Sequence, residues 1–144
     1  MSHNSLFSFQ NHSYDESGFT PHCYWLTHLK TDKQKTDQIN LTQDILTRLT
    51  GKAPTMFRFP GLCRSATDDK LVENLGYIIN NGSVIASDPF NHSLEKIISN
   101  VLTRAKDGGV IVMHIGGPNA RESYDALIKI IPELEARGYV FGKL

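Results

Sequence analysis

The sequence lacks an excess of charge of either sign, a long apolar run and a basic block. Its 15 basic and 15 acidic side chains give a formal net charge of zero, which argues against a nucleic acid or an anionic membrane as the partner. No apolar run approaches the roughly 18 residues that a bilayer span needs. The first residues also lack the charged and apolar regions of a secretory signal. With 144 residues, the chain is long enough for one domain with a sizeable core.

Cysteine is also scarce, since only Cys23 and Cys63 are present. Their separation matches no common metal-binding spacing, and they could pair in an oxidising compartment. A disulfide requires Cα atoms within about 7 Å of each other, and the sequence does not reveal that distance. We expect two free thiols, with a disulfide as the alternative.

From about residue 31 onward, helical and extended patterns alternate. Capping residues and apolar residues at helical spacing predict helices over 32–49, 65–76, 93–102 and 119–137, the last with an Asn119–Glu122 capping box. Short apolar runs predict strands over 56–59, 77–79, 84–86, 110–113 and 139–141. This order is typical of an α/β fold with a parallel sheet and covering helices.

The first 30 residues fit this alternation less well. Residues 6–9 alternate like a strand, whereas residues 17–28 mix Gly, Pro, His, Cys, Tyr and Trp without a period. We expect 17–28 to be a long ordered loop, and such loops in compact domains are often functional.

The most informative segment is 110–117, in which four apolar residues lead to His114 and then to two glycines. Parallel α/β folds place reactive groups at the carboxyl ends of their strands. His114 is therefore a candidate acid or base, and the alternative is a hydrogen-bonded core histidine.

Two further polar residues accompany predicted strands. Asp88 follows the strand at 84–86 and precedes Pro89. It is either a turn or cap residue, or it hydrogen-bonds His114 and keeps that imidazole protonated as a general acid. Arg58 lies within an apolar run, where it either holds a catalytic carboxylate or extends along the core surface to solvent.

A possible metal-binding segment begins at His12. His12 and Glu16 place an imidazole and a carboxylate four residues apart, with Asp15 between them. These donor types bind divalent metals such as zinc. The alternative is that His12 caps a turn and that both acids are solvated.

Several of these segments occur in a familiar order: Asn11–Tyr14, a helix and an Arg-x-Pro strand within Thr42–Gly61, Leu75–Tyr77, Asp88, Val112–His114 and Leu134–Tyr139. In this order and spacing, the chain resembles the polysaccharide deacetylase family, the NodB-homology domains. The resemblance covers nearly the whole chain and corresponds to the C-terminal two-thirds to three-quarters of such a domain.

The resemblance implies a partial, irregular (β/α) barrel with mostly parallel strands. It implies removal of acetyl groups from N-acetylated sugars, such as those of chitin or peptidoglycan, by water activated on a divalent metal, with zinc expected. By similarity, His12 is a metal ligand, with Glu16 at the second ligand position. His114 is the general acid, Asp88 tunes it, and Arg58 orients the catalytic base.

Further expectations concern the glycan and the compartment. Tyr24 and Trp25 could stack on sugar rings, or they could form a small satellite core. Members of the family often work at or outside the cell envelope.

The departures from the family pattern are equally informative. Only eleven residues precede His12 and none is acidic, so the family's Asp-Asp segment has no counterpart. Glu16 replaces the second motif histidine, for which His22 or His28 could substitute, and Gly61, Pro89 and Ile115 replace other family residues.

Three hypotheses follow from these departures. The chain is a deacetylase domain given without its N-terminal strands, or a catalytically inactive module that binds carbohydrate or acts as a scaffold, or an unrelated α/β enzyme. An incomplete barrel has open sheet edges, which favour a homodimer unless the N-terminal segment covers them.

Overall fold

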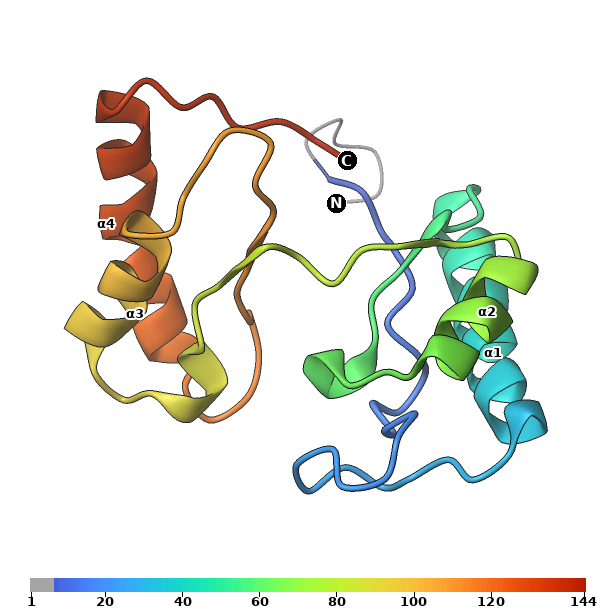
Figure 1. Cartoon of the computed structure of the whole chain (residues 1–144). Helices are drawn as coiled ribbons and strands as arrows, with labels where there is room; N and C mark the ends of the chain where they lie inside the picture. The colour runs from blue at the N-terminus through green and yellow to red at the C-terminus, as the bar shows by residue number, and fades with distance from the viewer. Residues whose placement is uncertain (1–6) are drawn as a thin grey trace. The chain divides into compact units, whose positions relative to one another are not determined.

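The computed structural model describes residues 7–144, and these form two compact units. The first unit extends to Asn81 and includes Lys143–Leu144, and the second comprises Gly82–Gly142. Figure 1 shows the helices of each unit, and each unit is described here by itself. Among the described residues, no helix combines the length and apolar character needed to cross a membrane.

The first unit contains two helices, a parallel strand pair and one 3-10 turn. In chain order these are α1 (Asp32–Thr50), β1 (Met56–Phe57), η1 (Pro60–Leu62), α2 (Ala66–Asn74) and β2 (Ile78–Ile79). Met56 lies opposite Ile78 in the pair. Both predicted helices are confirmed, because Thr31 and Ser65 each complete a capping box.

Three phenylalanines form the centre of the first core. Phe19, Phe57 and Phe59 are fully buried, with ring centroids 5.0–5.5 Å apart, a spacing that favours tilted and edge-to-face contacts. Phe57 and Phe59 come from β1 and the residues after it, whereas Phe19 comes from the predicted loop at 17–28. This loop is therefore attached to the core at its start.

The N-terminal segment covers the outer edge of β1 at one residue. The Asn11 backbone N–H donates to the Met56 carbonyl, and the Arg58 N–H donates to the Asn11 carbonyl, both at 3.0 Å. The strand predicted at 6–9 is not formed over residues 7–9, and Leu6 lies outside the described residues. The prediction was wrong because a single bridge between Asn11 and Phe57 replaces a ladder.

The second unit repeats the same plan with its own core. It contains β3 (Val84–Ile85), η2 (Asp88–Phe90), α3 (Leu94–Leu102), β4 (Ile111–Val112) and α4 (Ala120–Ala136). β3 and β4 pair in parallel, and α3 packs against α4. The buried apolar side chains form one cluster: Val84, Ala86, Ile97, Val101, Ala126, Ile130 and Leu134.

These units confirm the predicted α/β class with parallel strands, in two separate pairs and without a closed barrel among residues 7–144. The strand predicted at 139–141 is not formed. Instead, the Tyr139 N–H donates to the Leu134 carbonyl and its hydroxyl to the Ala105 carbonyl, while Val140 is 93% exposed. After α4 ends, the apolar run is therefore held by the hydrogen bonds of Tyr139 and does not pair as a strand.

A buried ion pair connects the two helices of the first unit. Lys35 Nζ of α1 lies 2.5 Å from Asp68 Oδ1 of α2, and the side chains are 11% and 2% exposed. The Lys35 ammonium also lies 5.9 Å from the centroid of the Phe19 ring. Burial opposes ionisation of Asp68, but hydrogen bonds from Lys35 and Ser65 outweigh burial and lower the pKa of Asp68.

Lys35→Met is expected to lower the free energy of unfolding by about 3–5 kcal/mol, because it leaves the Asp68 carboxylate charged and buried without its cation. Lys33→Met, two residues earlier on α1, is the control. Its ion pair with Asp37 is exposed, so the expected loss is below about 0.5 kcal/mol. Denaturant unfolding at pH 7 measures both, and equal losses would contradict this account.

Candidate active site

His114 lies just beyond the carboxyl end of β4, as predicted, and it is held there by Asp88. The His114 backbone N–H donates to Asp88 Oδ2 at 2.7 Å, and its ring Nδ1 lies 3.0 Å from Asp88 Oδ1. An ionised carboxylate only accepts hydrogen bonds, so Nδ1 carries the hydrogen and Nε2 is the nitrogen that exchanges a proton. The imidazole is 41% exposed and therefore accessible from solvent.

Asp88 reaches this position because the chain turns sharply after β3. Ser87 adopts a left-handed conformation with φ of 60°, and η2 then begins at Asp88 with Pro89 in its first turn. The Asp88 side chain is 0% exposed and also accepts a 2.6 Å hydrogen bond from Ser123 Oγ. Burial opposes its ionisation, but the hydrogen bonds from His114 and Ser123 outweigh burial and lower the pKa of Asp88.

Two features of the site were not predicted. Ser123 of α4 was not named as a site residue, and Asn119, at the start of α4, was expected to act as a helix cap. The Asn119 amide donates to the backbone carbonyls of Asp88 at 3.0 Å and Pro89 at 3.2 Å. The predicted capping box is therefore wrong, because the Asn119 side chain makes no cap hydrogen bond and supports η2 instead. The signal was available, since residues 119 and 123 lie four apart and so share one helix face.

His12 and Arg58 are brought together in the first unit. His12 Nδ1 lies 2.7 Å from the Arg58 backbone carbonyl, which only accepts, so Nδ1 donates and the lone pair belongs to Nε2. Metal-ligating histidines commonly fix their ring by such a bond to a carbonyl. The orientation of His12 is therefore suitable for one metal ligand.

Arg58 directly follows β1, so its predicted place inside the strand is corrected by one residue. Burial lowers the pKa of its guanidinium, and the negative charge of Glu16 opposes this effect. Within residues 7–144, Arg58 forms no ion pair with a carboxylate. The structure thus leaves Arg58 half-buried and influenced by Glu16 only at longer range.

The predicted metal ligands form an incomplete set. Among the described residues, no three His, Cys, Asp or Glu side chains come together in a group that could hold a metal ion. Asp15, beside Glu16, accepts hydrogen bonds from the Ser17 N–H and the Gln38 amide instead. Apart from the orientation of His12, residues 7–144 do not by themselves fit a divalent metal.

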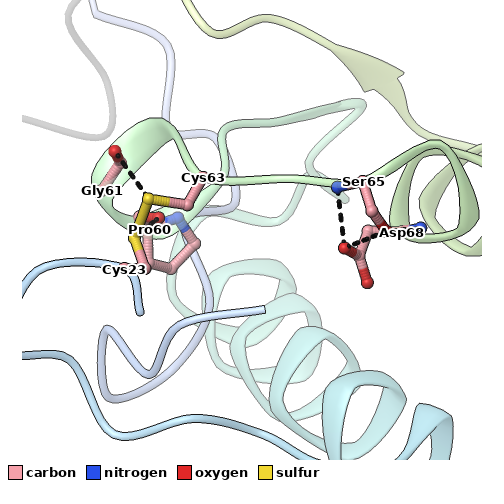
Figure 2. The surroundings of a disulfide bond; sticks show 6 residues. All are labelled: Cys23, Pro60, Gly61, Cys63, Ser65 and Asp68. Atoms are coloured by element: carbon pink, nitrogen blue, oxygen red, sulfur yellow. Dashed lines mark hydrogen bonds between the residues drawn. A yellow bond between two sulfur atoms is a disulfide. The ribbon is translucent and has the colours of Figure 1, made fainter. Parts of the chain in front are cut away.

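The two cysteines form a disulfide, which corrects the expectation of free thiols. Cys23 and Cys63 have Cα atoms 5.9 Å apart and sulfurs 2.07 Å apart, and Figure 2 shows the bond beside Pro60 and Gly61. The two residues are separated by 40 positions, so only the folding of the loop back onto η1 brings them together. The spacing of the two cysteines in the sequence therefore does not predict that they meet.

Ser123→Ala is expected to lower the free energy of unfolding at pH 7 by about 1.5–3 kcal/mol, because it removes a hydrogen bond to a buried charged carboxylate. The effect should depend on pH. The folded-state pKa of Asp88 is below its ordinary value, so this stabilisation is complete above about pH 4 and is lost as the pH falls through the lowered pKa.

Ser99→Ala, at an exposed position of α3, is the matched control, and it should change stability by less than about 0.5 kcal/mol. Denaturant unfolding between pH 3 and pH 7 is the measurement. A Ser123→Ala loss that stays constant across this range would show that the hydroxyl does not support the charged form of Asp88.

Comparisons with known proteins place this geometry in context. The family model described as polysaccharide deacetylase matches residues 1–79. Two peptidoglycan-N-acetylglucosamine deacetylases of Bacillus cereus are 33% and 36% identical over 92 and 109 residues, which cover 62% and 75% of this chain. The matched regions span 43% and 40% of those relatives, less than half of their length.

Solved structures agree with this assignment. A peptidoglycan N-acetylglucosamine deacetylase in complex with a substituted N-oxidanyl-benzamide matches with a TM-score of 0.80 and 30% identity, over 93% of this chain and 59% of the other. A family 4 acetyl xylan esterase from Clostridium thermocellum, in complex with a cobalt ion, matches with a TM-score of 0.77 and 28% identity, over 92% and 60%.

A CE4 family pseudoenzyme from Bacillus anthracis, at 18% identity and a TM-score of 0.75 over 90% of this chain and 42% of the other, shares the fold alone. The family match covers more than half of the sequence, and the relative at 36% identity covers three quarters of it. The chain therefore belongs to the polysaccharide deacetylase family.

Proposed function

We propose that this chain contributes the proton-donating part of a carbohydrate N-deacetylase, which hydrolyses acetamido groups on N-acetylated sugars. The observation that carries the proposal is the buried Asp88 carboxylate on the exposed His114 imidazole. The carboxylate fixes the ring through Nδ1 and leaves Nε2 as the nitrogen for proton transfer, the arrangement that a general acid acting through Nε2 requires.

His114 would act at the bond that breaks. When the carbonyl carbon of the acetamido group takes the oxygen of water, a proton of that water passes to the catalytic base, the C–N bond breaks and acetate is released. The departing sugar nitrogen then takes a proton from Nε2 of His114. Asp88 acts through His114 as a positioning residue, and Ser123 in turn positions Asp88. Arg58 is proposed to orient the catalytic base.

The proposed substrate class is an N-acetylglucosamine-containing glycan. Support comes from the two relatives and the solved structure that are named peptidoglycan-N-acetylglucosamine deacetylases. The disulfide supports an oxidising compartment, because such bonds persist outside the reducing cytosol. A cell-envelope or secreted location is therefore part of the proposal.

A divalent metal remains part of the proposed function, with zinc as the expected ion. The cobalt ion in the related acetyl xylan esterase supports a metal of this charge. His12 is the proposed imidazole ligand, because its ring is fixed through Nδ1, and Glu16 is the proposed second donor. Since residues 7–144 gather no set of three ligands, we assign no chemical step to the metal.

The alternative function is a catalytically inactive module that binds carbohydrate or acts as a scaffold. The same incomplete set of ligands among the described residues favours it. A homodimer through an open strand edge also stays a prediction, since Asn11 covers the β1 edge at one residue.

Acetate release from an N-acetylglucosamine pentamer, with Co²⁺ or Zn²⁺ added, distinguishes the two functions. We expect the wild-type chain to release acetate, His114→Ala to abolish release, and His92→Ala, an exposed histidine, to leave it unchanged. Release by the wild type no faster than by His114→Ala would reject catalysis by this chain and favour the binding module.

Calorimetric titration with Zn²⁺ tests the metal proposal separately. We expect wild-type binding to weaken at least about tenfold in His12→Ala, the order of loss typical when a ligand or its support is removed, and to be unaffected in His92→Ala. Equal affinities of the wild type and His12→Ala would remove His12 from the ligand set.

A further inference from the structure

The loop at residues 17–28 carries no Asp, Glu, Lys or Arg, although 21% of the whole chain is charged. What it offers instead is aromatic rings, two histidines and hydroxyl groups. A surface of this composition suits an uncharged partner with an apolar face and polar edges. It offers aromatic area for stacking and groups for hydrogen bonds, and it has no Asp, Glu, Lys or Arg that would favour a partner of opposite charge.

The loop is closed at its base by backbone hydrogen bonds. The Gly18 N–H donates to the Thr27 carbonyl at 2.8 Å, and the Leu29 N–H donates to the Gly18 carbonyl at 2.9 Å. Phe19 anchors the beginning of the loop in the core. The two ends are therefore fixed, and the segment between them is short enough to hold one shape.

The tip of the loop is fixed as well, by the Cys23–Cys63 disulfide and by close contact with Gly61. A Cβ atom added to Gly61 would lie 2.5 Å from Cys23 Sγ and 3.1 Å from Tyr24 Cδ2, so only glycine leaves room for the tip. Figure 2 shows this junction, with the disulfide beside Pro60 and Gly61. Arg58 lies only two residues before Pro60.

Two aromatic rings project from this fixed tip. Tyr24 and Trp25 are 59% and 76% exposed, with ring centroids 5.9 Å apart and planes inclined by 58°. Tyr24 has a φ of 51°, an uncommon conformation for a bulky residue that persists only where its surroundings impose it. The chain thus holds a large aromatic surface in place at an energetic cost.

We propose that Tyr24 and Trp25 form a platform that stacks on a pyranose ring of an N-acetylated glycan, and that the disulfide and Gly61 hold the platform in shape. A pyranose has an apolar C–H face for the rings and hydroxyls for His22 and Thr20. It is uncharged, and the loop carries no Asp, Glu, Lys or Arg. The choice of an N-acetylated glycan as the ligand rests on the proposed function, whereas the evidence for an aromatic platform is the composition and geometry of the loop itself.

Trp25 is the only tryptophan of the chain, so its fluorescence reports directly on the platform. The probe is an N-acetylglucosamine tetramer, titrated into the wild type and into His114→Ala, in which the ligand is not consumed. We expect a saturable change in Trp25 emission in both proteins. Absence of a saturable change in both would overturn the platform.

Tyr24→Ala should weaken tetramer binding about tenfold, the loss expected on truncating an aromatic anchor. Tyr124→Ala is the matched control, because Tyr124 on α4 is also 59% exposed, and it should bind as the wild type does. Equal affinities of the two variants would overturn the proposal. Tetramer binding without acetate release would reject the proposed catalysis and support the platform. Acetate release without binding at Trp25 would reject the platform and support the proposed catalysis.

Two sets of substitutions test whether the disulfide and Gly61 hold the tip of the loop in shape. They are Cys23→Ser/Cys63→Ser and, independently, Gly61→Ala in the oxidised protein. Both should weaken tetramer binding severalfold while circular dichroism retains the helical signal. Should the double variant not fold, Gly61→Ala alone decides, since its Cβ displaces the tip without breaking the bond. Wild-type affinity in Gly61→Ala would show that the shape of the tip does not matter for binding.

Discussion

One buried carboxylate, that of Asp88, connects the segments of the second unit on which the proposed chemistry depends. Its two oxygens accept hydrogen bonds from the backbone and ring of His114 and from Ser123. Its backbone carbonyl accepts from Asn119. The end of β3, the end of β4 and the start of α4 therefore meet at a single charge. Such a charge is costly to bury unless every acceptor is used, so the residues that satisfy it also fix the imidazole.

Much of this arrangement could be predicted from the sequence. The apolar run before His114 indicated a strand end, and Asp88 after another strand was interpreted either as a turn or cap residue or as a hydrogen-bond partner of His114. The structure forms that hydrogen bond. Helix caps at Thr31, Ser65 and Ser93 are local signals, and the structure uses each of them. Structural features that depend on a few consecutive residues could therefore be predicted from the sequence.

What could not be predicted depends on contacts between distant segments. The disulfide requires the loop at 17–28 to fold back onto η1, and no spacing records that. Asn119 has the identity of a helix cap, yet its side-chain oxygen makes no cap hydrogen bond. Its amide nitrogen instead donates to three backbone carbonyls, those of Asp88, Pro89 and Asn91. Tyr139 begins an apolar run, but its hydroxyl donates to the Ala105 carbonyl, and residues 139–141 form no strand.

The two halves of the proposed function differ in how they are built. The residues of the proposed proton donor all lie within the second unit, whereas the first unit supplies an oriented His12 and an aromatic loop but no full set of metal ligands among the described residues. The proposed acid catalysis and the proposed glycan binding therefore depend on different residues, and substitutions in one unit test each of them while leaving the core of the other unit intact.

Asp88 holds the His114 ring with its hydrogen on Nδ1 and leaves Nε2 as the nitrogen that exchanges the proton. Nitrogen-15 NMR of the neutral His114 ring measures this directly, because a protonated and an unprotonated ring nitrogen differ widely in chemical shift. We expect the Nδ1–H form in the wild type and a mixture of both forms in Asp88→Ala. A wild-type ring in the Nε2–H form would contradict it.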